Sequence, residues 1–290
     1  MKTMKNLLIN PATGKELNIE CDVADADRWL QGSFEPAAVC GRHQNGVWIF
    51  TRPEDVEKTD EYRSGDPYRV ETGLSHESRF HQARTDCTEN LVGKYIPDTP
   101  GLALLDIGCG EGHLTHHIKT RFSNLQTVYA LDMSYTACVR GKQLYPEIEF
   151  VVGNAYHPPF QDRCFDVVLM NNIWEHVPDP LRMLEAAART LKDGGFVVIS
   201  TPNRFRLGNI LQLAKTGKCR LVSTHHVTEY SQGQVVEQLE FMNFSVVDVS
   251  APWIGSCRSK FFRRFLRTIL FCRRSRLAFE NPLFFVARKK

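Results

Sequence analysis

The stretch Leu104-Leu-Asp-Ile-Gly-Cys-Gly-Glu-Gly112 decides the fold, because it joins an apolar run to a glycine-rich turn. The apolar residues predict a strand buried on both faces, and the glycines allow the backbone to approach a ligand at the strand's carboxyl end. The dinucleotide-binding fingerprint needs a glycine at position 113, where the chain has His113. Asp106 ends the strand, and its charge would repel a pyrophosphate but attract a cationic ligand.

Strands and helices alternate after this stretch. Further short apolar runs predict strands at 127–131, 148–152, 165–170 and 196–200, and helical spacing is clearest at 180–191. This alternation predicts a parallel sheet with right-handed crossovers. We therefore expect an α/β protein with a Rossmann-like doubly wound sheet, mostly parallel with an antiparallel last strand. The remaining predicted elements are helices at 76–95 and 232–242 and strands at 244–249 and 283–287.

The chain divides into two unequal parts. Residues 1–70 are rich in turn-forming residues, and they predict a small irregular N-terminal module with short strands near 7–9 and 47–50. Residues 71–290 hold the alternating pattern and form the main domain. Within it, the polar stretch at about 203–230 interrupts the alternation and predicts a lid over the site.

A second acidic residue, Asp132, ends the next predicted strand in Ala130-Leu-Asp-Met-Ser134. A carboxylate at this place can accept hydrogen bonds from both hydroxyls of a ribose. One aspartate at a strand end can equally cap a turn or a helix. Two acids at consecutive strand ends, one beside a glycine turn, favour a ligand site over capping.

Between about 91 and 249 the chain resembles the class I S-adenosylmethionine-dependent methyltransferases, especially the ubiquinone-biosynthesis-like (methyltransferase type 11) branch. The resemblance rests on the ordered stretches at 105–112, 131–134, 153–155, 165–169, 174–180 and 191–195.

The resemblance implies S-adenosylmethionine as the cofactor, with the glycine turn at the methionyl part and Asp106 at its amino group. It assigns Asp132 to the ribose and places Asn171 near the sulfonium. The family more often has Asp at position 154, but the Asn154 amide can still bond the adenine amino group. The implied cofactor-binding residues are Asp106, Gly108, Cys109, Gly110, Asp132, Met133, Asn154, Ala155 and Asn171.

Methyl transfer is an in-line displacement at carbon, so the enzyme mainly aligns nucleophile, methyl group and sulfur. A hydroxyl acceptor would benefit from a general base, for which the candidates are His176, His225 and His226. A packing role is the stronger interpretation for His176. The pair at 225–226 lies on the predicted lid, where this branch gathers groups that face the acceptor.

We expect no metal. Some quinone O-methyltransferases use a metal held by carboxylates around the Glu175-His176 pair, but Asn172 stands where such a carboxylate is expected. Residues 9–17 are similar to a zinc-ribbon start, yet Asn10 and Thr13 replace its cysteines, so the module is a degenerate zinc ribbon without zinc.

The charge is unevenly distributed. Residues 258–290 contain eleven Lys or Arg and one Glu, whereas the whole chain has a net charge of only +3. The basic amphipathic segment at 256–277 could lie on an anionic membrane surface, or pack on the sheet as the crossover between the last two strands. No run of residues is long and apolar enough to span a membrane. We therefore expect a cytoplasmic protein, possible peripheral contact with the inner membrane surface through this segment, and no nucleic-acid partner.

The sequence thus predicts a methyltransferase that acts on oxygen in a small or lipid-like acceptor. Alternatives are a catalytically inactive methyltransferase-fold binding protein and an N-methyltransferase. An NAD oxidoreductase is disfavoured by Asp106 and His113. The sequence does not predict an oligomeric state.

Overall fold

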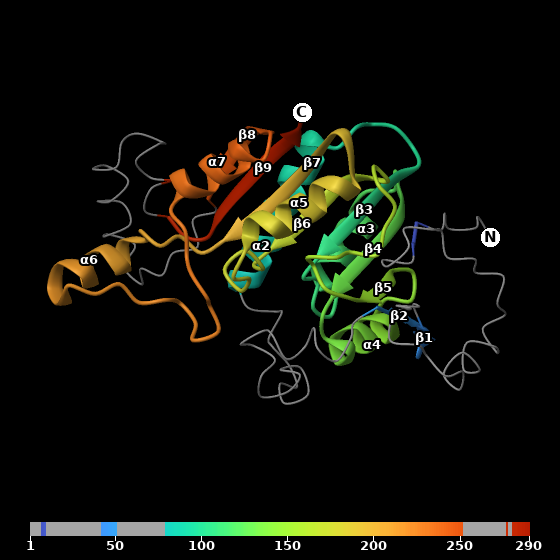
Figure 1. The fold of residues 1–290 in the computed structure, drawn as a ribbon, viewed down its shortest axis with the longest axis horizontal. Helices are drawn as coiled ribbons and strands as arrows, with labels where there is room; N and C mark the ends of the chain where they lie inside the picture. The colour runs from blue at the N-terminus through green and yellow to red at the C-terminus, as the bar shows by residue number, and fades with distance from the viewer. Residues whose placement is uncertain (1–6, 10–41, 51–78, 252–276, 278–279) are drawn as a thin grey trace.

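The computed structural model describes residues 7–9, 42–50, 79–251, 277 and 280–290 (Figure 1). Their strands form one nine-stranded sheet with the order β1-β2-β5-β4-β3-β6-β7-β9-β8. The strands are β1 (Arg42–Gln44), β2 (Val47–Ile49), β3 (Leu102–Ile107), β4 (Leu125–Asp132), β5 (Glu149–Val152), β6 (Phe165–Asn171), β7 (Leu191–Thr201), β8 (Phe244–Ser250) and β9 (Leu283–Lys289). The helices are α2 (Arg79–Tyr95), α3 (His113–Arg121), α4 (Tyr135–Leu144), α5 (Pro180–Thr190), α6 (Leu207–Thr216) and α7 (Gln232–Phe241).

The centre of the sheet is parallel, and each end contains antiparallel pairs. Strands β5, β4, β3, β6 and β7 run parallel to their neighbours, whereas β9 lies antiparallel between β7 and β8. Helices cover both faces: α5 and α7 pack on one, and α2, α3 and α4 pack on the other (Figure 1). The predicted doubly wound α/β fold with an antiparallel last strand is therefore confirmed.

The central strands are largely apolar because both of their faces are covered. All six residues of β3 are buried. Leu105 and Ile107 belong to the core under α5 and α7, while Leu102 and Leu104 belong to the core on the opposite face. A strand in this position has no solvent-facing side, so its sequence is a continuous apolar run.

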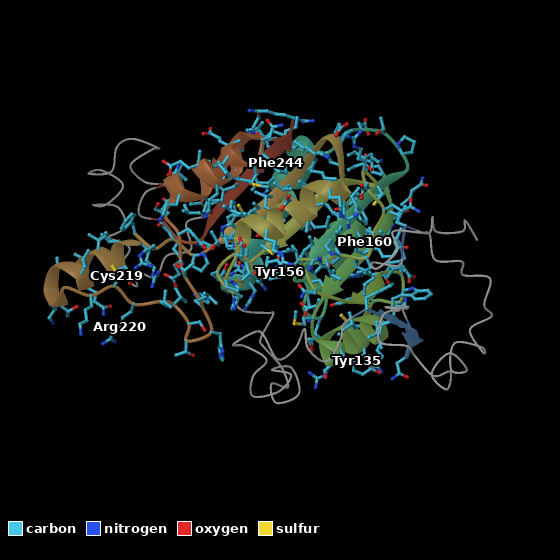
Figure 2. The ribbon with its side chains drawn as sticks, viewed as in Figure 1. Tyr135, Tyr156, Phe160, Cys219, Arg220 and Phe244 are labelled. Atoms are coloured by element: carbon cyan, nitrogen blue, oxygen red, sulfur yellow. The ribbon has the colours of Figure 1, made fainter. Side chains whose placement is uncertain are left out.

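The N-terminal segments that the structure describes extend this same sheet. Strand β2 pairs in parallel with β5, and β1 forms an antiparallel hairpin with β2. Leu8 pairs with Phe160, a buried core residue labelled in Figure 2. The short strands predicted near 7–9 and 47–50 thus contribute to the core of the main domain. The predictions for residues 10–41, for the boundary at 70 and for the basic segment up to 276 fall outside the described residues.

The predicted lid contains α6, which extends away from the sheet (Figure 1). Asn203 anchors its start, because the Asn203 N–H donates to Asn281 Oδ1 (2.7 Å) and the Asn203 side chain donates to the Glu280 carbonyl (2.8 Å). None of the helices described here is both long and apolar enough to cross a bilayer.

Gly141 in α4 tests the tightness of the packing around Phe150. A Cβ on Gly141 would lie 2.5 Å from the Phe150 ring and 2.7 Å from the Glu111 carbonyl oxygen. We expect Gly141→Ala to lower the free energy of unfolding by about 1–3 kcal/mol, because neither the buried ring nor the backbone can move away freely. Urea unfolding measures the change.

Gly233→Ala is the matched control, because Gly233 is also helical but a Cβ added there would have no atom within 4 Å. Its unfolding free energy should stay equal or rise slightly, as expected from helix propensity. Equal stability of the two variants would show that the packing around Phe150 is loose.

Candidate active site

The carboxyl ends of three parallel strands are joined by backbone hydrogen bonds. The Gly108 N–H after β3 donates to the Leu131 carbonyl in β4 (2.8 Å), and the Gly153 N–H after β5 donates to the Asp132 carbonyl (2.9 Å). The loops that follow β3, β4 and β5 therefore leave the sheet at one common edge. This edge is where ligands bind in doubly wound sheets.

The glycine turn after β3 exposes its backbone. Gly108 has φ 76°, and a Cβ at this position would lie 2.8 Å from Ile173 Cδ1. Gly110 also has positive φ, and its N–H donates to Asp132 Oδ2 (2.7 Å). A side chain at 108 would thus be both strained and obstructed, which explains the glycine there.

A cavity of about 250 Å³ lies against this turn. Five of the nine cofactor residues predicted from the sequence line it, namely Asp106, Gly108, Cys109, Gly110 and Asn171. The other four do not belong to its lining, although they follow the ends of the neighbouring strands β4 and β5: Asp132, Met133, Asn154 and Ala155. The structure therefore groups the residues predicted for the methionyl half more closely than those predicted for the adenosine half.

The sequence did not predict that α2 forms one wall of the cavity. His81, Arg84, Thr85 and Thr88 line the cavity from one face of this helix. Their spacing of three and four residues is a polar stripe at helical period, which was visible in the sequence. Its meaning was hidden because the sequence alone did not show that α2 packs over the glycine turn.

Asp106 is a buried carboxylate on the cavity wall. Its Oδ2 accepts a hydrogen bond from Thr115 Oγ1 (2.6 Å). Burial raises the pKa of Asp106 from its usual 3.8 to about 7; the Thr115 bond opposes this rise and the charge of Asp132 adds to it. A nearby cation would favour the ionised form, because opposite charges attract strongly away from water.

Asp132 supports the turn through both of its carboxylate oxygens. Its Oδ2 accepts from Gly110 N–H, and its Oδ1 accepts from Ser134 N–H (2.9 Å). A carboxylate offers about four lone-pair positions in total, so it can support the turn and still accept from a ligand. Asn154 is likewise held by its loop, since its Oδ1 accepts from Tyr156 N–H (2.9 Å).

Asn171 presents a buried donor to the cavity. Its Oδ1 accepts from Thr88 Oγ1 at 3.4 Å, whereas its Nδ2 is buried without a hydrogen-bond partner among the described residues. Buried polar groups in folded proteins almost always have partners. An acceptor atom of a bound ligand would supply the missing one. The next residue, Asn172, is instead tied to the sheet, because its Oδ1 accepts from Ser200 Oγ (2.9 Å).

A second group of polar residues lies beyond Asn172. Glu175 is fully buried, and its Oε2 accepts from Thr201 Oγ1 (3.0 Å). The rings of His176 and His226 meet edge to face with centroids 4.9 Å apart. One nitrogen or oxygen from each of these three residues lies within 4.8 Å of the others, which is close enough for the set to hold a cation. Burial raises the pKa of Glu175, and the two histidines partly oppose that rise.

The two groups are linked through Arg84. Its side chain lines the cavity, and the charge of Glu175 acts on it. Burial lowers the pKa of Arg84, while Glu175 raises it. The cavity and the histidine cluster are therefore neighbouring parts of one electrostatic environment.

His226 is held by a network within the lid. Its Nδ1 lies 3.0 Å from Glu229 Oε1, and Glu229 also pairs with Arg206. Burial opposes ionisation of Glu229, but the bonds from His226, Val222 N–H and Arg206 outweigh it and lower its pKa. Because an ionised carboxylate only accepts, His226 must donate through Nδ1. His225 is different: it is exposed and stands outside the cluster.

Residues 105–199, from β3 to the end of β7, match the family model described as a methyltransferase domain. The chain carries a class I S-adenosylmethionine-dependent methyltransferase domain. A probable S-adenosylmethionine-dependent methyltransferase of Mycolicibacterium smegmatis is 25% identical over 188 residues, which cover 65% of this chain and 68% of that relative.

Two further relatives of this methyltransferase domain are named as quinone enzymes. The demethylmenaquinone methyltransferase of Lysinibacillus sphaericus is 32% identical over 127 residues, covering 43% of this chain and 54% of the relative. The ubiquinone biosynthesis O-methyltransferase of Xanthomonas oryzae pv. oryzae is 28% identical over 173 residues, covering 56% and 72%. The match thus spans from 54% to 72% of the length of these relatives.

Solved structures share the fold of the methyltransferase domain. Geranyl diphosphate methyltransferase in complex with S-adenosylmethionine has a TM-score of 0.53 at 17% identity, over 80% of this chain and 96% of that one. The [4+2]-cyclase SpnF also has a TM-score of 0.53, at 16% identity, over 76% and 84%. S-adenosylmethionine is the cofactor of the domain family, and the cradle at Gly108 and the unpartnered amide of Asn171 fit a bound ligand.

The raised pKa of Asp106 predicts a pH-dependent stability. The folded protein binds a proton at Asp106 more tightly than the unfolded chain does, so stability falls as pH rises from about 4 to about 7. Asp106→Asn removes this titration. In the absence of cofactor, the variant should therefore gain stability relative to the wild type as pH rises from about 4 to about 7. The difference between their free energies of unfolding should increase by about 2–4 kcal/mol over this range.

Urea unfolding at a series of pH values measures this difference. Asp162→Asn serves as the control for the same substitution at a largely exposed carboxylate. A flat profile for Asp106→Asn would mean that Asp106 remains ionised in the folded protein.

Proposed function

We propose that the protein transfers the methyl group of S-adenosylmethionine to an oxygen atom of a small or lipid-like acceptor. The observation that carries the proposal is the cavity behind the glycine turn, where a buried carboxylate and an unpartnered amide face the same space. The two relatives named as quinone methyltransferases support a lipid-like acceptor.

The cofactor supplies a methyl group on a positively charged sulfur. Asp106 would bind the ammonium of the methionyl part and would ionise as it does so, because the added positive charge lowers its pKa. The Nδ2 of Asn171 would donate to an oxygen of the ligand. Together these residues fix the ligand's orientation, which is the main requirement of an in-line displacement.

The ends of β4 and β5 would bind the nucleoside. Asp132 would accept hydrogen bonds from the ribose hydroxyls in addition to those from Gly110 and Ser134, because a carboxylate can accept about four in all. Met133, Asn154 and Ala155 would contact the adenine. The support for this assignment is their position, since these residues follow the strand ends that flank the glycine turn.

We assign the role of general base to His226. The Nδ1–H bond to Glu229 fixes one tautomer, so Nε2 of the neutral ring carries the lone pair that can take a proton from an acceptor hydroxyl. His176 packs against this ring and would orient it. His225 lacks such support because it is exposed, so we do not assign it a catalytic role.

Calorimetry with S-adenosylmethionine tests the nucleoside site. Asp132→Asn should weaken cofactor binding by about tenfold to a hundredfold, because a charged acceptor of hydroxyl hydrogen bonds becomes a neutral one. Asp166→Asn is the control: Asp166 also accepts from a backbone N–H, that of Ala103, but at the opposite end of the strands. Wild-type affinity in Asp132→Asn would refute the ribose assignment.

A methyl-transfer assay with a cell extract tests whether His226 acts as the general base. With labelled cofactor, His226→Gln should lower the rate by about a hundredfold or more while cofactor affinity is unchanged, and His225→Gln should react like the wild type. Mass analysis of the product identifies the methylated atom and separates oxygen from nitrogen.

Two other results would change the proposal. If the wild type binds the cofactor but labels nothing in the extract, the protein is a methyltransferase-fold binding protein. If a chelator abolishes transfer, and both His176→Gln and Glu175→Gln lose it too, these residues and His226 hold a cation instead of acting as a base.

A further inference from the structure

Helix α6 differs from an ordinary surface helix in which of its sides is buried. Its one buried residue is polar, Asn209. The apolar residues Leu207, Ile210, Leu211 and Ala214 recur at a spacing of three and four, and this stripe lies on the side of the helix away from Asn209. A helix that stabilises its own domain turns such a stripe inward. Here Leu211 is 59% exposed.

Exposed apolar side chains are concentrated around this helix. The described residues contain nine exposed large hydrophobic side chains, and six of them belong to the lid: Phe205, Leu211, Leu213, Leu221, Val222 and Val227. Scattered exposed apolar residues are normal, but a group of this kind on one projection marks an interaction site. We call these six residues, together with α6, the α6 surface.

The charged residues of the predicted lid are mostly positive. Residues 203–230 contain five Lys or Arg and one acidic residue, Glu229. Arg206 is neutralised by its pair with Glu229, which leaves four cations: Arg204, Lys215, Lys218 and Arg220. Figure 2 shows Arg220 and Cys219 beside α6, on the part of the molecule that extends from the sheet.

Hydrogen bonds fix this orientation. Asn209 Nδ2 donates to the Arg204 carbonyl (2.9 Å), and Arg206 Nη2 donates to the Arg220 carbonyl (2.6 Å). These two bonds thus connect the segment before α6 to the helix and to the segment that follows it. The side of α6 that carries Asn209 is thus bonded to the lid's own backbone, while Leu211 and Ala214 on the other side are exposed.

We propose that the α6 surface docks on an anionic lipid membrane. Apolar side chains that enter the headgroup region, flanked by Lys and Arg, are the features of helices that lie in a membrane interface. A second copy of the chain would place like charges together, and so would the basic segment at 256–277. Negatively charged headgroups complement both the charge and the apolar stripe. This inference does not depend on methyl transfer.

Cosedimentation of the full chain with vesicles tests the proposal. The wild type should sediment with vesicles of phosphatidylcholine and phosphatidylglycerol, and it should stay in the supernatant with phosphatidylcholine alone. Added salt should weaken the binding, because it screens the attraction.

Matched variants locate the contact. Leu211→Gln should weaken vesicle binding by about tenfold, while Phe241→Gln should leave it unchanged, although Phe241 in α7 is 78% exposed. Lys218→Glu should weaken it by about tenfold, while Arg121→Glu on α3 makes the same charge change elsewhere and should have little effect.

Three results would overturn the proposal. The wild type could fail to bind anionic vesicles, or Leu211→Gln and Lys218→Glu could bind as the wild type does. Light scattering could also show a dimer that Leu211→Gln dissociates, which would assign the α6 surface to a second copy.

Discussion

The site depends on one hydrogen bond, from the N–H of Gly110 to the carboxylate of Asp132. Together with the bond from the Gly108 N–H to the Leu131 carbonyl, it joins the turn after β3 to the end of β4, so two strand ends become one edge. A donor without a side chain is needed, because Gly110 has positive φ and the same turn passes Ile173 at Gly108 with no room for a Cβ. The carboxylate thereby holds the turn open and, with about four lone-pair positions, can also accept from a ligand.

The parallel core could be predicted from the sequence because burial on both faces leaves an unbroken apolar pattern. The details of α5 were harder. Helical spacing at 180–191 predicted the helix but not which side is fully buried, which the structure places at Met183, Leu184 and Ala187. The predicted helix also ran one residue too far, because Leu191 begins β7. The pairing of β2 with β5 was also beyond prediction, since the two strands lie about a hundred residues apart.

The residues of the candidate site likewise differ in whether the sequence could predict their positions. The glycine turn, Asp106 and Asn171 were predictable because each follows a strand whose direction the fold determines. The edge-to-face contact of His176 with His226 was not, because a lid of irregular structure brings residues fifty positions apart together. Both histidines stood out in the sequence, but nothing there indicated that Glu229 fixes one of them, or that Glu175 lies beside both.

Beside the histidine cluster, residues 227 and 228 of the predicted lid bond to one carbonyl of the segment that follows β6. The N–H groups of Val227 and Thr228 both donate to the carbonyl of Glu175. The side chain of that residue belongs to the histidine cluster, so two hydrogen bonds, of 2.8 and 3.3 Å, connect the backbone of the predicted lid to the cluster. The carbonyl of Glu175 therefore ties the backbone position of residues 227 and 228, next to His226, to the residue whose side chain lies beside both imidazole rings.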